Sequence, residues 1–99
     1  MIKTQNVSLK LSIIQSKGNI ASDMDGEKVL MSIKNSKYYN LGKLGGVIWD
    51  IIETKISVTN LIAILLSEYD IEQSMCEEQV ITFLELLNRE GLIIIGDET

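Results

Sequence analysis

The hydrophobic pattern of this 99-residue chain changes period at Gly42, and this change constrains the fold more than any other feature. Before Gly42, apolar and polar residues alternate, which is the pattern of half-buried β-strands. After Gly42, apolar residues recur at spacings of three and four, which is the pattern of amphipathic helices. Strands followed by helices predict an α+β architecture, and we expect residues 1–99 to form one such domain.

The segment before Gly42 predicts an antiparallel β-meander of about three strands. Its first strand is expected at 7–13, and a second segment, 20–24, leads into a tight turn at Asp25-Gly26. Both turn residues tolerate positive φ, which a two-residue hairpin requires. The return strand is expected at 28–33, with Val29, Met31 and Ile33 on one face, and a last strand at 37–41.

Three helices are expected in the second part of the chain. Ser57 has the position of an N-cap for the second helix. Ser74 and Glu77 have the spacing of a capping box for the third helix, and Gly91 ends it. The inward stripe of the third helix is expected to contain Cys76, Val80, Phe83, Leu84 and Leu87, and a further extended segment follows at 92–95.

The residue types argue against catalysis. Histidine is absent, so the chain lacks the commonest general base and the commonest metal ligand. The single cysteine, Cys76, falls on the apolar stripe beside Glu77 and Glu78, so we expect a packed core thiol. The glycines at 42, 45 and 46 lack the Gly-Lys-Ser/Thr of a phosphate loop. We therefore predict a protein that is not an enzyme and that uses no metal and no cofactor.

The same composition suggests a cytoplasmic protein. One cysteine cannot form an intramolecular disulfide, which fits a reducing compartment. No apolar run approaches the ~20 residues that a membrane helix needs. No apolar signal-peptide core follows the lysine near the N-terminus, so no membrane partner is expected.

The charge of the expected third helix indicates whether this part of the chain could bind nucleic acid. A three-helix unit ending in Leu-x-x-x-Gly-Leu-Ile is typical of a winged helix, whose third helix would enter the DNA major groove. The expected third helix carries Glu77, Glu78, Glu85 and Glu90 against the single Arg89. Phosphates would repel such a helix, and phosphate contacts supply most non-specific affinity. A winged-helix-like shape is therefore predicted without nucleic-acid binding.

An ordered series of motifs in this sequence resembles the PqqD-like proteins. The motifs are Asp25-Gly26, Tyr38-Tyr39-Asn40-Leu41, Ile48-Trp49, the helix from Ser57 to Asp70, and the segment from Val80 to Ile93. Together they span about residues 19–95. The resemblance implies a recognition element for ribosomally synthesised and post-translationally modified peptides (RiPPs), in which three strands and three helices bind a precursor's leader peptide.

A free-standing chain of this length looks most like the lasso-peptide kind of recognition element. That resemblance implies three partners: a precursor leader, a leader peptidase of the transglutaminase-like cysteine protease type, and an asparagine-synthetase-like cyclase. It also implies that the leader carries a spaced Tyr and Pro, so that an aromatic anchor enters a pocket near Val80, Phe83 and Leu84.

The candidate binding site follows from the edge of the meander. Its last strand leaves backbone N–H and C=O groups unpaired, and an extended peptide can add there as another strand. We expect Tyr38, Tyr39, Asn40 and Leu41 to form the docking strand, Gln79, Val80, Phe83, Leu84 and Leu87 to form the helical wall, and Met31 and Ile33 to lie beneath. Several of these apolar residues are also expected in the core. Ile81 and Leu86 are both apolar, so the sequence leaves open which edge of the third helix faces the ligand.

Two other functions stay open at the level of sequence. One is a winged-helix regulator that binds DNA, which the negative charge of the expected third helix disfavours. The other is a scaffolding subunit whose edge strand pairs with another protein without reading a peptide.

Overall fold

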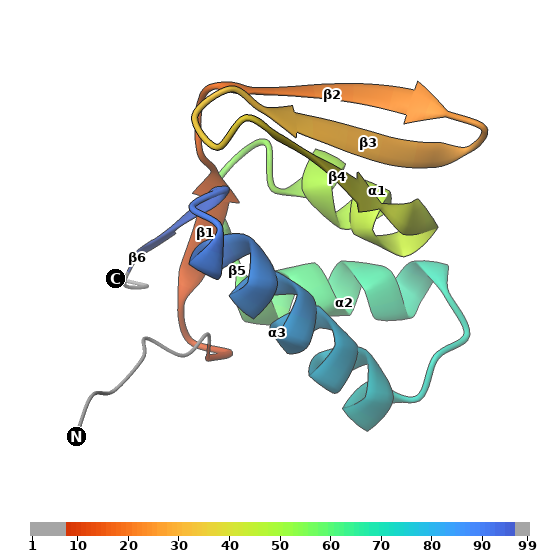
Figure 1. Cartoon of the computed structure of the whole chain (residues 1–99). Helices are drawn as coiled ribbons and strands as arrows, with labels where there is room; N and C mark the ends of the chain where they lie inside the picture. The colour runs from red at the N-terminus through yellow and green to blue at the C-terminus, as the bar shows by residue number, and fades with distance from the viewer. Residues whose placement is uncertain (1–7, 97–99) are drawn as a thin grey trace.

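The computed structural model describes residues 8–96 and confirms the predicted α+β architecture (Figure 1). Six strands and three helices occur in this part of the chain. In chain order they are β1 (Ser12–Gln15), β2 (Asn19–Met24), β3 (Glu27–Ser32), β4 (Lys37–Leu41), α1 (Gly42–Ile51), β5 (Ile56–Ser57), α2 (Val58–Glu68), α3 (Gln73–Arg89) and β6 (Ile93–Gly96).

The strands form two separate antiparallel sheets, one of order β2-β3-β4 and one of order β5-β1-β6. The first is the predicted three-stranded meander. The prediction that the strand at 7–13 belongs to that meander is wrong, although Val7 lies outside the described residues. β1 begins at Ser12, and Ile13 pairs with Ile56 on one side and Ile95 on the other. Alternation along the chain cannot reveal this pairing, because the partners are more than forty residues away.

The local signals in the sequence give mixed results. Asp25 and Gly26 form the β2–β3 turn with φ of +55° and +81°, as predicted. Ser57 caps α2, since its side chain accepts a hydrogen bond from Asn60 N–H at 3.0 Å. The capping box predicted at Ser74 is wrong, because the N-cap of α3 is Glu72, two residues earlier, and it makes no side-chain hydrogen bond.

The C-terminal end of α3 has the geometry expected of a glycine stop. Gly91 has φ of +76°, a left-handed conformation that glycine adopts without steric cost. Leu92 N–H then donates to the Leu87 carbonyl at 2.8 Å, and Gly91 N–H donates to the Asn88 carbonyl at 3.0 Å. These bonds satisfy carbonyls at the helix end and direct the chain into β6.

One cluster of buried side chains connects both sheets to all three helices. Its members are Ile13, Leu30, Ile48, Trp49, Ile52, Val58, Leu61, Ile62, Leu65, Cys76, Val80, Leu84, Leu87, Leu92 and Ile93. On β3, the buried residues are Leu30 and Ser32, at 0 % and 1 % exposed. Val29, Met31 and Ile33 do share a face, as predicted, but it is the outer face of the sheet.

The orientation of β3 is set by its contact with α1. Lys28 points toward this helix, and its Nζ lies 2.9 Å from Asp50 Oδ1. A Cβ added at Gly46 would lie only 2.8 Å from Lys28 Cβ, so glycine is needed for this close approach. Residues of β3 with the same parity as Lys28 therefore face the helices, and those with the opposite parity face outward.

Candidate functional site

β4 is an edge strand of the meander, and α3 lies on the same side of this sheet as the other two helices (Figure 1). Among the described residues, β4 forms a ladder with β3 only. Its inward residues Tyr39 and Leu41 are half-buried, whereas Tyr38 is 74 % exposed. The strand therefore presents one free backbone edge next to a partly apolar inner face.

The register shows which backbone groups on β4 are free. Ile33 N–H donates to the Gly18 carbonyl at 3.2 Å, so Ile33 bonds toward β2. Consecutive residues of a strand bond in opposite directions, so Ser32 and Leu30 bond toward β4, where they pair with Lys37 and Tyr39.

The residues between these bonded pairs face the other way. The backbone groups of Tyr38 and Asn40 are therefore directed to the open edge. By the same alternation, the open edge of β2 presents the backbone groups of Ala21 and Asp23. The docking strand predicted at residues 38–41 thus has two residues whose backbone is free for a new strand.

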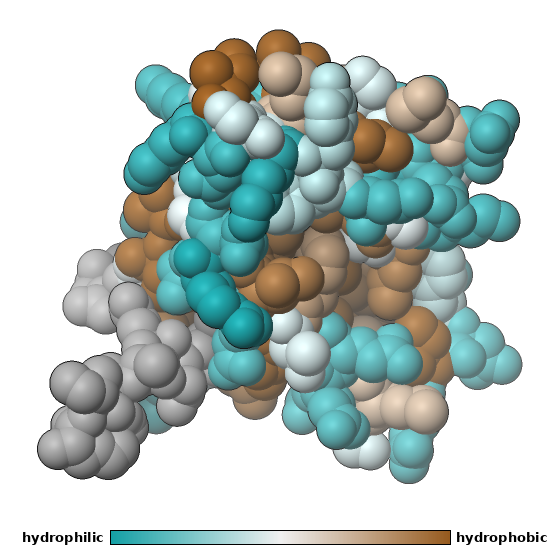
Figure 2. Space-filling model, in the orientation of Figure 1, coloured by the Kyte–Doolittle hydropathy of each residue, from teal (hydrophilic) through white to brown (hydrophobic). Residues whose placement is uncertain are grey.

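A groove with a volume of about 650 Å³ runs along α3. Its lining residues are Met75, Glu78, Gln79, Thr82, Phe83, Leu86 and Arg89. They recur at spacings of three and four, so they form a single stripe on the helix beside the buried stripe. Figure 2 shows apolar surface in the hollow between the upper sheet and the helices below it.

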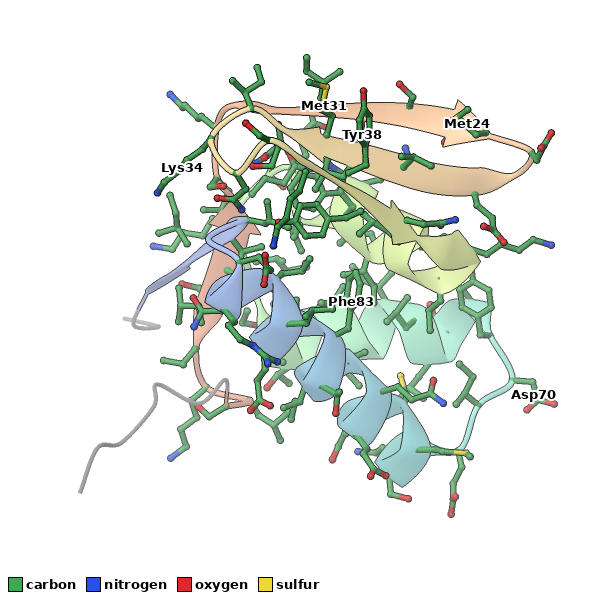
Figure 3. All side chains as sticks on the ribbon, viewed as in Figure 1. Met24, Met31, Lys34, Tyr38, Asp70 and Phe83 are labelled. Carbon is green, nitrogen blue, oxygen red and sulfur yellow. The ribbon has the colours of Figure 1, made fainter. Side chains whose placement is uncertain are left out.

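Phe83 connects this groove to β4. A Cβ added at Gly45 in α1 would lie 2.9 Å from Phe83 Cζ and 3.2 Å from Leu41 Cβ. The absence of a side chain at Gly45 therefore lets the Phe83 ring lie against α1 next to Leu41. Figure 3 shows Phe83 on the side of α3 that faces the upper sheet. The ring forms a continuous apolar surface between the groove and the inner face of β4.

A hydrogen-bonded cluster joins the turn before β4 and the middle of β4 to the C-terminal end of α3. The Tyr39 hydroxyl donates to Glu90 Oε1 at 2.7 Å, and Asn35 Nδ2 donates to the Tyr39 hydroxyl at 3.0 Å and to the Glu90 carbonyl at 2.8 Å. The hydrogen bond to Glu90 is the main cause of a raised Tyr39 pKa, and desolvation adds to it. The cluster fixes the distance between strand and helix at this end.

The two ends of the groove differ in charge. Glu78 lies toward the N-terminal end of α3 and Arg89 lies at its last residue. Eleven residues separate them, which corresponds to about 16 Å along a helix. An extended segment of about five residues covers that length. The middle of the groove, at Thr82, Phe83 and Leu86, carries no charge.

The structure separates the predicted site residues into groups. Gln79 and Phe83 line the groove, and Tyr38, Tyr39, Asn40 and Leu41 form the edge strand as predicted. Val80, Leu84 and Leu87 are at most 1 % exposed, so they support the groove from the core and do not line it. The placement of Met31 and Ile33 beneath the groove is wrong, because both lie on the outer face of the sheet.

Five groove residues were not predicted: Met75, Glu78, Thr82, Leu86 and Arg89. Of the two apolar residues that the sequence left undecided, Leu86 is 43 % exposed and lines the groove, whereas Ile81 packs against the core. The sequence does contain a pattern that could have indicated them. Residues 75, 79, 82 and 86 recur at helical spacing beside the buried stripe, with apolar residues at both ends of the series.

Two further observations concern the thiol and the possible metal ligands. Cys76 is 1 % exposed, and burial, followed by the charge of Glu77, raises its pKa. The thiol is therefore a buried core group, as predicted. Residues 8–96 contain no group of three side chains suited to hold a metal ion. Within the same residues, no helix combines the length and the apolar character needed to cross a membrane.

A family model described as coenzyme PQQ synthesis protein D (PqqD) matches residues 27–93. The chain belongs to the PqqD family. The matched segment runs from β3 to the beginning of β6, so it includes the edge strand, the Tyr39–Glu90 contact and all of α3. The resemblance found in the sequence motifs is confirmed.

Solved structures give a second comparison. The PqqD-family chain is similar to the structure of TbiB1 in complex with the TbiA(beta) leader peptide, with a TM-score of 0.73 and 22 % sequence identity. The match covers 81 % of this chain and 93 % of that chain. At this identity the similarity establishes a shared fold. No curated protein sequence matched the chain.

Proposed function

We propose that this PqqD-family protein recognises the leader peptide of a RiPP precursor by binding it as an added strand on β4. The observation that carries the proposal is the open edge of β4 directly beside the apolar groove of α3. The shared fold with TbiB1, whose structure contains a leader peptide, supports the same assignment.

In this proposal, the backbone and the side chains of the site have different roles. An added strand bonds to the free backbone groups of Tyr38 and Asn40, and such bonds are tolerant of sequence. Alternate side chains of the bound peptide then point toward α3. An aromatic anchor of the leader rests against Phe83 and Leu86, with the buried Val80 as support behind them. Discrimination between peptides comes from this buried contact.

The proposed role is binding without catalysis, in the cytoplasm. The chain has no histidine and its one thiol is buried, so neither a general base nor a nucleophile of these kinds lies at the groove. We place the protein in lasso-peptide maturation, where it delivers the bound precursor to a separate leader peptidase and cyclase. A DNA-binding role is not favoured, because Glu77, Glu78 and Glu85 belong to the helix that would enter the major groove.

Amide exchange tests the proposal directly. The protein is titrated with a synthetic leader from the precursor encoded beside its gene, and backbone exchange is followed by NMR. We expect the amides of Tyr38 and Asn40 to slow on binding. The amide of Tyr39 should change little because it already bonds to Leu30, and the amides of Ala21 and Asp23 on the other edge should not change. A leader that binds as a helix, or that leaves Tyr38 and Asn40 unprotected, contradicts the proposal.

A further inference from the structure

The outer face of the β2–β3–β4 sheet is apolar and open. Ile20, Met24, Ile33 and Tyr38 are 53 %, 59 %, 58 % and 74 % exposed. An antiparallel sheet with one solvated face normally carries polar residues on that face. Here the apolar residues recur on the solvated side, and clusters of exposed apolar side chains mark interaction sites.

These side chains form one continuous surface. Met31 lies at its centre, paired with Ile20 on one neighbouring strand and with Tyr38 on the other. Figure 3 shows Met31 and Tyr38 projecting from the sheet on the side away from the helices, with Met24 near the far end of β2. Figure 2 shows apolar surface along the top of the molecule, above this sheet. We call Ile20, Met24, Val29, Met31, Ile33 and Tyr38 the outer patch.

Charges of opposite sign lie at the two ends of the outer patch. Lys17 and Lys34 belong to the turns at one end, before β2 and between β3 and β4. Asp25 belongs to the β2–β3 turn at the other end. Between them, the only charged side chain on this face of the described strands is Glu27, which accepts a hydrogen bond from Asn40 Nδ2 at 2.9 Å.

We propose that the outer patch binds the outer patch of a second copy of this chain. Two sheets pack face to face with their strands nearly aligned, as in a β-sandwich. A two-fold axis between the sheets and perpendicular to the strands places the Lys17 and Lys34 end of one copy over the Asp25 end of the other. An axis along the strands would superimpose like charges, so the charge distribution selects the first arrangement.

The size of the outer patch indicates a reversible dimer. Three strands of six residues or fewer cover about 20 Å by about 14 Å. This footprint is well below the roughly 800 Å² per partner of a standard stable interface, so the association is expected to be weak and transient. Tyr38 takes part in both surfaces through different groups, since its side chain lies in the outer patch and its backbone lies on the open edge of β4. The groove of α3 is not part of the contact, and dimerisation is tested on the protein without peptide.

Sedimentation equilibrium from about 10 µM to about 1 mM, the range of weak association, measures the dimer. Wild type should form a dimer within this range, and Met31→Glu should remain monomeric because it places a carboxylate at the centre of the interface. Ile64→Glu is the matched control, since Ile64 is an exposed apolar residue on α2, and it should dimerise like wild type. Far-UV spectra and cooperative melts establish that each variant is folded.

A charge exchange tests the orientation of the two copies. Met24→Lys places a cation at the acidic end, facing Lys34 of the second copy, and should weaken the dimer at least fivefold. Lys34→Glu alone should also weaken it. The double variant should dimerise more tightly than either single variant, because the new charges attract. If wild type is monomeric over the whole concentration range, the inference is wrong, and the partner of the outer patch would be a different protein. A dimer that tolerates Met31→Glu, or a double variant as weak as the singles, overturns it equally.

Discussion

The two edges of the meander, β2 and β4, differ in what lies beside them. Both leave one row of backbone groups unpaired among the described residues. On β4, the inward side chains Tyr39 and Leu41 are half-buried and continue into the groove of α3. On β2, the inward residues Ala21 and Asp23 are exposed. A peptide added to β2 would gain main-chain bonds alone, whereas one added to β4 also buries side chains. An open edge therefore supplies affinity, and only the neighbouring helix makes it selective.

The largest expected effect comes from removing the apolar wall beside β4. Leu86→Glu places a carboxylate in the middle of the groove, where a bound leader would desolvate it. We expect leader affinity to fall by about 2 kcal/mol, the scale of an interface hot spot, which corresponds to about 30-fold in Kd. Calorimetric titration measures this change.

Ile64→Glu controls for this variant, because it adds the same charge at an exposed apolar position on α2. Its leader affinity should equal that of wild type. If both variants bind the leader like wild type, the groove does not contact the peptide. The groove would then not be what makes β4 more selective than β2.

A smaller effect is expected from removing a single free N–H from each edge. Tyr38→Pro deletes an N–H that faces the open edge, so the ladder with β3 keeps its bonds, and proline is tolerated on such edges. Loss of one hydrogen bond to the leader, about 1 kcal/mol, should raise Kd roughly fivefold. Ala21→Pro makes the same change on β2 and should leave Kd unchanged.

The proline pair decides between the two edges. Tyr38→Ala, measured in parallel, separates the loss of the side chain from the loss of the N–H. If Ala21→Pro weakens binding and Tyr38→Pro does not, the leader occupies β2, and the assignment of the site to β4 is wrong.

The smallest effect on binding is expected at Tyr39, which holds β4 to α3 without lining the groove. Tyr39→Phe removes the hydroxyl that donates to Glu90. We expect a lower melting temperature and a leader Kd within twofold of wild type, because the groove itself is unchanged. A large loss of binding with an unchanged melt would show that the hydroxyl contacts the peptide.

The pH dependence of this variant gives a further check. The bond to Glu90 raises the Tyr39 pKa above its ordinary value of 10.0, so folding favours the neutral phenol. The stabilisation is fully present below about pH 10 and is lost as the pH rises through the raised pKa. The melting difference between wild type and Tyr39→Phe should therefore disappear at strongly alkaline pH.

The sequence by itself determined the three-stranded meander, the order of the three helices and part of the chemistry that is available, but not β5 or the sheet to which β1 belongs. The change of period at Gly42 separates the meander from the helices, and Asp25-Gly26 forms the predicted turn because its conformation depends on two adjacent residues. Ser57 is likewise predicted correctly, since an N-cap bonds only three residues ahead. The absence of histidine excludes the most common catalytic base by composition alone.

Tertiary structure decided which side of each element is covered. Alternation on β3 defines two faces, but both carry apolar residues, and only the contact of Lys28 with α1 at Gly46 turns Leu30 inward and Met31 outward. On α3, two adjacent stripes are apolar enough to be buried. Packing against the core selects Val80, and Leu86 is left for the groove. Periodicity is a property of neighbouring residues, whereas burial depends on partners that are distant in the chain.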